Sequence, residues 1–131
     1  MKHKLKYLKL FEGLSTEEIP YSNIDKEGKL NIGIPSYIYE LPPEYNQLTD
    51  EITGDIFIYK NQHITEIIGF NNLKTVGKML LIDSNQSITE ISGFNSLEVV
   101  GWSFFIKSNK SLTKITGFSN LTRVAMSLHI Q

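Results

Sequence analysis

Few residues of this chain have the type and spacing that chemistry requires. The histidines, His3, His63 and His129, stand too far apart to supply the paired metal ligands of a short motif. The chain has no cysteine, so thiolate metal sites and disulfide bonds are excluded. Neither a glycine-rich phosphate loop nor a nucleophile elbow occurs. The sequence therefore predicts no bound metal, no cofactor and no enzymatic activity.

One pair of carboxylates could still suggest acid/base catalysis. Glu66 and Glu90 lie 24 residues apart, at equivalent positions of two repeated segments. Catalytic carboxylate pairs depend on environments that push their pKa values apart. The third repeat has Lys114 at this position, and threonine precedes each of the three residues. We therefore expect a solvated column of charges here.

The segments that must position these residues are three copies of one 24-residue unit. The copies occupy residues 64–87, 88–111 and 112–131, and the third is shorter than the others. A fixed period in this range is typical of a solenoid, in which units stack because one alone cannot bury its apolar face. Most of the second half of the chain is thus predicted to be one stack of coils.

Within each unit, apolar residues first recur every three positions. Gly69, Gly93 and Gly117 interrupt these runs, which disfavours a helix and favours turns. A glycine at a repeated position suggests a positive φ or a close backbone approach. The residues expected inside the coils are Ile82, Ile91, Phe94, Ile106, Ile115 and Phe118.

After each valine the apolar spacing changes to two, which indicates a strand. The pairs Ile56 and Ile58, Leu80 and Ile82, Phe104 and Ile106, and Leu128 and Ile130 all fall at even positions. We therefore expect one strand per coil with its even positions inside, starting with residues 55–59. Strands stacked about 4.8 Å apart would form a parallel sheet along the solenoid.

An asparagine follows each of the first three strands at the same phase: Asn61, Asn85 and Asn109. A buried asparagine at a corner can bond the backbone of the next coil and satisfy turn groups. The sequence predicts an asparagine ladder.

This pattern resembles the leucine-rich-repeat superfamily, in particular the short repeats of receptor-L-domain type. The resemblance covers residues 52–131. It implies a right-handed β-rich coil with a parallel sheet, of three to four rungs plus an N-terminal cap. It also implies a non-catalytic binding module, because the family binds many unrelated ligands. Ala125 and Thr53 replace the last glycine of the pattern. The matching residues of one unit are Leu80, Ile82, Asn85, Ile88, Ile91, Gly93, Phe94, Leu97, Val100 and Gly101.

The first part of the chain departs from the repeat. Residues 30–52 keep some of its phase but contain Pro42 and Pro43, which exclude a central helix. We expect a degenerate capping coil there, a repeat solenoid over 53–131 and a leader or cap over 1–29. In the leader, Leu5, Leu8 and Phe11 could share a helical face. Its segment YLKLFEGLS resembles N-terminal segments of proteins from large tailed bacteriophages; the alternative is an amphipathic cap on the solenoid.

The odd strand positions predict a surface. Phe57, Leu81, Phe105 and His129 would form a stripe on the outer face of the sheet. Exposed apolar patches on monomers usually have a use. Either this stripe binds a partner, or residues 1–29 fold across it. The polar residues expected beside the stripe are Tyr59, Asp83 and Lys107. Trp102 stands at the start of a strand, where we expect a core or rim position.

Three functions remain open on these observations. The first is a protein-binding module that uses the stripe, and the second is a phage structural or virion-associated protein with a docking leader. The third is a carbohydrate binder that stacks sugars on Phe57, Tyr59 and Phe105. A net charge of −1 gives no sign of nucleic-acid binding, and no stretch approaches the length of a membrane span. We expect a cytoplasmic protein, or a virion component if it is phage-encoded.

The last strand, residues 126–131, is followed by no further coil. An open strand edge can pair with another chain. We therefore expect either a homodimer through this C-terminal edge or a chain that belongs to a longer array.

Overall fold

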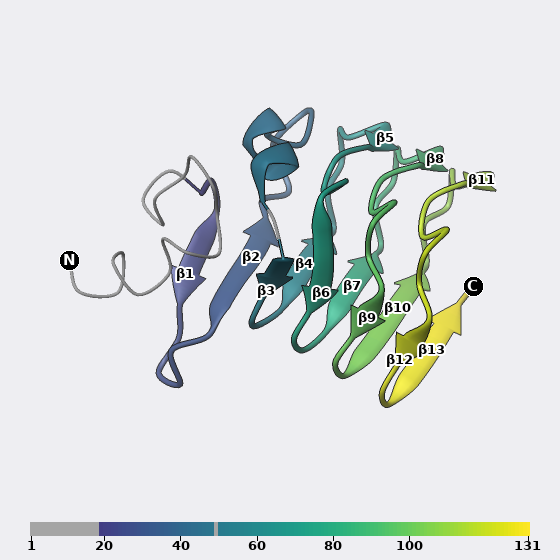
Figure 1. The fold of residues 1–131 in the computed structure, drawn as a ribbon. Coiled ribbons are helices and arrows are strands. Elements are labelled where there is room, and N and C mark those ends of the chain that lie inside the picture. The colour runs from purple at the N-terminus through teal and green to yellow at the C-terminus, as the bar shows by residue number, and fades with distance from the viewer. Residues whose placement is uncertain (1–18, 49) are drawn as a thin grey trace.

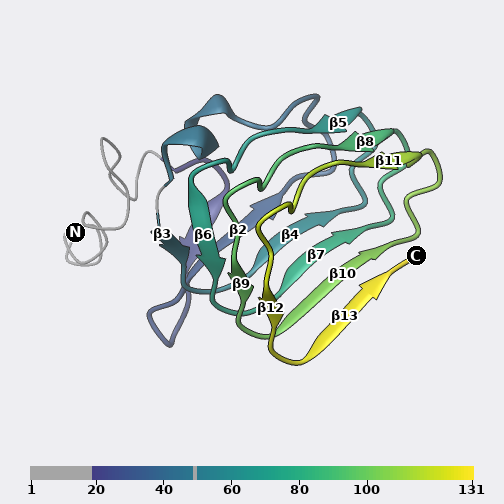
Figure 2. The same cartoon turned by 45° about the vertical axis from the view of Figure 1, so that its right-hand side comes forward.

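The computed structural model describes residues 19–48 and 50–131, which form a β-solenoid of about 4 turns (Figure 1). Each full coil contributes one strand to each of three sheets that run along the solenoid axis. Figure 2 shows the coils nearly end-on, with the three sheets as the sides of one flattened tube. The predicted β-solenoid with parallel strands is confirmed.

The large sheet has six strands in the order β1, β2, β4, β7, β10, β13. All neighbours in it pair in parallel except β1 and β2, which form an antiparallel hairpin. Its strands are β1 (Ser22–Ile24), β2 (Leu30–Ile34), β4 (Ile56–Tyr59), β7 (Leu80–Asp83), β10 (Ser103–Lys107) and β13 (Ser127–Ile130).

The other two sheets are narrower because their strands are shorter. A three-stranded sheet contains β5 (Glu66–Ile67), β8 (Glu90–Ile91) and β11 (Lys114–Ile115). A four-stranded sheet contains β3 (Asp50–Ile52), β6 (Leu73–Val76), β9 (Val99–Val100) and β12 (Arg123–Val124). A short 3₁₀ helix, η3 (Pro43–Gln47), lies between β2 and β3.

The predicted strand parity holds in the three central coils. In β4 the buried residues are Ile56 and Ile58, while Phe57 and Tyr59 are exposed. Strands β7 and β10 bury their even positions in the same way. Ile82, Ile91, Phe94 and Ile106, all expected inside, are completely buried. The core is one continuous apolar column inside the tube.

Two of the three repeated glycines do not adopt a positive φ, and they serve instead to let the backbones of two coils approach closely. Only Gly69 of the three adopts a positive φ, of 110°. The left-handed positions are instead taken by the next residues, Phe70, Phe94 and Phe118. Gly93 is required by close approach, because a Cβ there would lie 2.6 Å from the carbonyl oxygen of Gly69.

The phenylalanines that follow these glycines stack along the interior. Ring centroids of Phe70 and Phe94 are 4.6 Å apart, and those of Phe94 and Phe118 are 5.3 Å apart. Tyr45 of η3 continues the column, with its ring 4.6 Å from that of Phe70. The degenerate coil therefore replaces the Gly-Phe corner with a tyrosine that fills the same space. The Tyr45 hydroxyl donates to the carbonyl oxygen of Pro20 at 2.6 Å, and burial raises the pKa of Tyr45.

The asparagine ladder is present. Asn61, Asn85 and Asn109 are buried behind the corner that follows the large sheet. The Asn85 Oδ1 accepts the backbone N–H of Asn61 at 2.9 Å, and the Asn109 Oδ1 accepts that of Asn85 at 3.0 Å. Each side chain thus bonds the preceding coil and holds two coils in register.

The last coil corrects part of the predicted core. Ile115 is 38% exposed and Phe118 is only partly buried, although both were expected inside. Leu128 and Ile130, at interior positions of β13, are 56% and 55% exposed. The physical reason is that their other side faces no further coil in the described part of the chain.

The N-terminal hairpin extends the large sheet at its first edge. Its turn is held by Asp25, whose Oδ1 accepts the backbone N–H groups of Glu27 and Lys29 at 2.9 Å each. These bonds, that from Lys29 foremost, hold the pKa of Asp25 below its ordinary value. Glu27 also pairs with the Nζ of Lys78 at 3.0 Å, which raises the pKa of Lys78 and ties the hairpin to a later coil.

The expected helical face of Leu5, Leu8 and Phe11 lies outside the described residues, as does the phage-like segment of residues 7–15. Residues 30–52 form a coil whose strands β2 and β3 pair in parallel with the next coil. No helix within residues 19–48 and 50–131 is long and apolar enough to cross a membrane.

Candidate functional site

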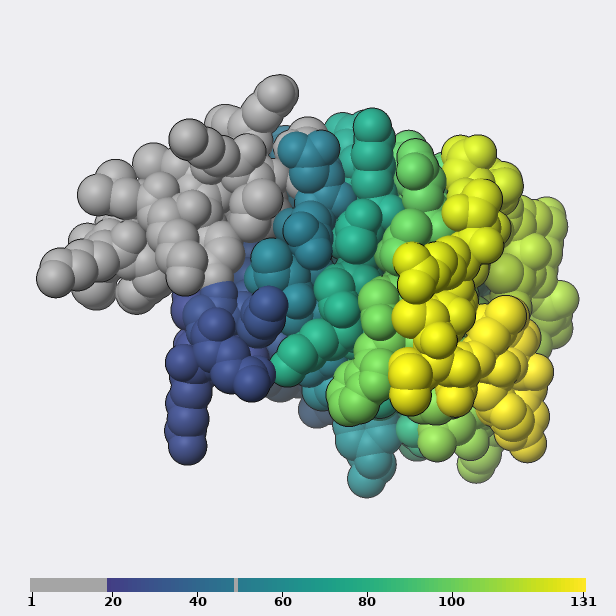
Figure 3. Space-filling view, turned by 60° about the horizontal axis from the view of Figure 1, so that its bottom comes forward, coloured from purple at the N-terminus to yellow at the C-terminus, as the bar shows by residue number. Residues whose placement is uncertain are grey.

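The predicted stripe is brought together on the outer face of the large sheet. Phe57 is in register with Leu81, Leu81 with Phe105, and Phe105 with His129. We call these four residues the apolar stripe. Figure 3 shows successive coils as adjacent bands of colour, and columns of equivalent residues cross these bands from coil to coil.

The stripe keeps part of its surface in solvent. Phe57 is 38% exposed, whereas Leu81 and Phe105 are half-buried against their neighbours. His129 is exposed and meets the Phe105 ring edge-on, with centroids 6.3 Å apart. Beyond Phe57 the next position in the column is Gly33, around which no atom lies within 4 Å of an added Cβ. The column therefore ends at an exposed position that carries no side chain.

The flanking residues Tyr59, Asp83 and Lys107 occupy the next outward column. Tyr59 is 43% exposed, and its register partner in the next coil is Asp83, followed by Lys107. The Lys107 Nζ lies 5.7 Å from the centre of the Phe105 ring, a cation–π distance. The predicted flanking residues thus border the stripe on one side.

The column on the other side of the stripe is already engaged within the protein. The Asp55 Oδ1 accepts the backbone N–H of Met79 at 2.9 Å, and the Asn31 Oδ1 accepts that of Asp55 at 2.7 Å. These side chains bond the coils to one another. On this side, Asn31 and Asp55 are therefore already occupied by bonds between coils.

The described leader residues do not cover the stripe. Residues 22–24 form β1, which adds to the edge of the large sheet beside β2 and lies in the plane of that sheet (Figure 1). The alternative that residues 1–29 fold across the face therefore does not hold for residues 19–29. Residues 1–18 lie outside the described part of the chain.

The column of Glu66, Glu90 and Lys114 lies on the three-stranded sheet, away from the stripe. Glu66 and Lys114 are exposed, and Glu90 is partly exposed. The Lys114 Nζ approaches the Glu90 carboxylate at 4.0 Å. The carboxylates therefore form the solvated charge column that the sequence predicts. No cluster of three or more metal-ligating side chains occurs among residues 19–48 and 50–131.

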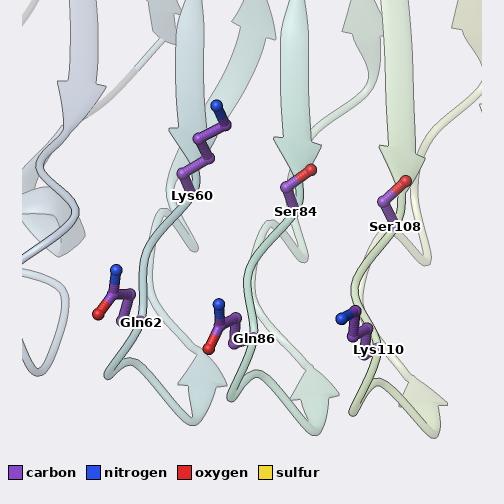
Figure 4. A pocket seen from close by; sticks show the side chains of 6 residues that line it. All are labelled: Lys60, Gln62, Ser84, Gln86, Ser108 and Lys110. Atoms are coloured by element: carbon purple, nitrogen blue, oxygen red, sulfur yellow. The ribbon is translucent and has the colours of Figure 1, made fainter.

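A second surface feature was not found from the sequence. A groove of about 290 Å³ runs across three coils at the corner that follows β4, β7 and β10 (Figure 4). We call it the corner groove. Its lining residues are Lys60, Gln62, Ser84, Gln86, Ser108 and Lys110. A signal for it exists in the sequence, because the two positions around each ladder asparagine are polar in every coil. The apolar phase alone does not reveal these positions.

Other exposed aromatic residues lie outside the stripe. Trp102 is about half-exposed at the start of β10, which places it on the rim. The Tyr39 ring stacks on the His63 ring with centroids 4.1 Å apart, and Tyr37 is exposed nearby in the same loop. His63 directly follows Gln62 in the sequence, but neither ring lines the corner groove, and Tyr39 lines a separate pocket with Glu40 and Glu66.

No protein-family model matches the chain, and no curated protein or solved structure matches it. The leucine-rich-repeat and phage resemblances therefore stay predictions.

Proposed function

We propose that the chain is a non-catalytic protein-binding module whose partner contacts the apolar stripe. The observation that carries this proposal is the register of Phe57, Leu81 and Phe105 on an outer sheet face where Phe57 and Tyr59 keep much of their surface in solvent. A contiguous apolar patch with a polar border is typical of a protein interaction site.

The stripe has the features of an interface centre. Aromatic side chains are enriched among the residues that carry most of the binding free energy of interfaces, and charges at the rim select the partner. Phe57 and Phe105 are the aromatic anchors, while Asp83 and Lys107 supply one charge of each sign beside them. Gly33, which is next to Phe57 in the column, carries no side chain and leaves open space for a bulky partner side chain.

A relation to the leucine-rich-repeat superfamily supports this proposal. The unit agrees with the receptor-L-domain pattern at ten positions in phase, and the solenoid has the parallel sheet that such repeats form. Repeat proteins use surfaces of this kind to bind partners.

The test is site-specific photo-crosslinking from the stripe. A photoreactive amino acid at Leu81 is compared with one at Val99, which is similarly half-buried but lies on the four-stranded sheet. The protein captured from the cell of origin is identified, purified and titrated against the wild-type chain. We expect capture from position 81 and not from position 99.

The same purified partner then tests the anchors. Phe105→Ser should weaken binding about thirtyfold or more, as expected for an aromatic residue worth about 2 kcal/mol or more. Val99→Ser is the matched control and should leave the dissociation constant unchanged. Equal capture from both positions, or an unchanged dissociation constant for Phe105→Ser, would place the partner elsewhere.

A further inference from the structure

The corner groove is a second surface, separate from the apolar stripe, whose side chains are all polar. Figure 4 shows them as two rows that cross three coils: Lys60, Ser84 and Ser108 in one row, and Gln62, Gln86 and Lys110 in the other. Both rows repeat at the spacing of the coils because each residue holds the same place beside a ladder asparagine. The groove therefore offers hydrogen-bonding groups at regular steps along the solenoid axis.

The backbone fixes the first row. Lys60, Ser84 and Ser108 all adopt left-handed φ values between 54° and 60°. The backbone N–H of Lys60 donates to the carbonyl oxygen of Asp83, and that of Ser84 donates to the carbonyl oxygen of Lys107. The second row is held by Gln86, whose N–H donates to the carbonyl oxygen of Asn61. The positions of Lys60, Ser84 and Gln86 are preorganised because each is bonded to a neighbouring coil.

The groove is positively charged. Lys60 and Lys110 line it, and no carboxylate does. Within residues 19–48 and 50–131, neither lysine forms an ion pair. The nearest acid in sequence is Asp83, whose Oδ1 accepts the Ser84 hydroxyl at 2.8 Å. Lys107 is in register with Asp83 in the next coil and offsets its charge. The charge of the groove thus favours an anionic ligand.

The same side chains argue against a peptide as the occupant. Extended peptides bind by adding a strand to a sheet edge or by placing apolar side chains in pockets. The corner groove crosses the coils at a turn, so it presents no strand edge, and none of its lining side chains is apolar. Amides and hydroxyls, which both donate and accept, suit a ligand that carries hydroxyl groups along its whole length.

We propose that the corner groove binds a linear acidic polysaccharide that lies along the solenoid axis. The coil spacing of about 4.8 Å is close to the length of one sugar in an extended chain. Lys60 and Lys110 are two coils apart and stand in opposite rows, which places one cation near each end of the groove, on opposite sides of the ligand. Gln62, Ser84, Gln86 and Ser108 bond the hydroxyls.

The test is isothermal titration of the full chain with an oligomannuronate and with the oligomannose of the same linkage, which lacks the carboxylate. We expect binding of the acidic sugar only.

Lys60→Gln combined with Lys110→Gln should weaken that binding at least about tenfold, because each lysine makes a charge-assisted hydrogen bond. The matched control combines Lys26→Gln with Lys74→Gln, which removes the same charge at exposed sites outside the groove. This control should bind as the wild type does.

Two further variants separate binding in the groove from binding at the stripe and from simple charge attraction. Gln86→Ala, in the middle of the second row, should weaken binding although it changes no charge, and its melting temperature should match that of the wild type. Phe105→Ser should leave sugar binding unchanged, so failure at the stripe and failure at the groove are distinguishable. Poly-glutamate is titrated alongside. Absence of oligomannuronate binding, equal binding of the neutral sugar or of poly-glutamate, or an equal loss in the lysine control would each overturn the proposal.

Discussion

Asn85 uses both ends of its carboxamide to join three coils. Its Oδ1 accepts the N–H of Asn61, and its Nδ2 donates to the carbonyl oxygen of Ile58 and to the Oδ1 of Asn109, each at 2.9 Å. All these groups are buried, so none can form a hydrogen bond with water instead when its partner is removed. The stacking of the coils therefore depends on a few buried polar side chains.

Replacing Asn85 with Ala should therefore lower the free energy of unfolding by about 1–3 kcal/mol for each backbone group left unpaired. Urea denaturation followed by circular dichroism measures the change. Asn95→Ala is the control, since Asn95 is exposed and its side chain makes a 3.3 Å contact with Asn71. If both variants unfold at the same urea concentration, the ladder contributes nothing special to stability.

Phe94 is the central ring of the interior stack and is completely buried. Phe94→Ala should cost about 3–5 kcal/mol, the range for truncating a large core side chain. The comparison is Ile68→Ala, at a position that is 56% exposed, which should cost far less. Equal midpoints of unfolding for these two variants would mean that the interior is assigned to the wrong residues.

The sequence predicts these single residues well where one pattern repeats. The asparagine ladder and the burial of Phe94 followed from phase alone, because every equivalent position must face the same surroundings. The left-handed φ of Phe94 could not be predicted in this way. Gly93 stands one residue earlier, and glycine is the residue that ordinarily takes a positive φ. Spatial packing decides the matter: the space beside Gly93 is filled by the backbone of the previous coil.

At the scale of elements, the solenoid is built from strands of two to five residues that gain stability by stacking. Close stacking needs room for the backbone of the neighbouring coil, and the repeated glycines provide it. Strand parity followed from the period of two. The β1–β2 hairpin did not, because β1 belongs to no repeat and its antiparallel pairing is set by the turn at Asp25.

The close approach at Gly93 makes a prediction about coil stacking. Gly93→Ala should destabilise the protein, because the new Cβ would lie 2.6 Å from the carbonyl oxygen of Gly69 and 3.1 Å from its nitrogen. Both are backbone atoms, so the coils must move apart.

Gly33→Ala is the matched variant, with nothing within 4 Å of its added Cβ. It should leave stability unchanged or raise it by about 0.5–1 kcal/mol, since alanine loses less backbone entropy than glycine in a strand. Calorimetric melting of both variants tests this. Equal effects of the two substitutions would show that coil spacing does not require glycine at 93.

At the scale of the whole molecule, the repeat places equivalent residues in columns along the solenoid axis, and these columns form the surfaces described above. The apolar stripe could be predicted because it needs only the strand parity and the 24-residue period. The corner groove could not be inferred from apolar patterning, because its residues lie at turns and have no periodic apolar signal. The place of Gly33 in the same column as Phe57 also depends on the pairing of β2 with β4, which the degenerate coil obscures in the sequence.

The central claim is that adjacent positions of β10 face opposite ways, one into the core and one toward a partner. Its most direct test is the melting temperature of two neighbouring variants, Phe104→Ser and Phe105→Ser. Phe104 is 1% exposed and packs against Phe118, with ring centroids 4.7 Å apart, whereas Phe105 lies on the outer face. We predict a large fall or loss of folding for Phe104→Ser and a nearly unchanged melting temperature for Phe105→Ser. Equal falls, or a larger fall for Phe105→Ser, would contradict the claim.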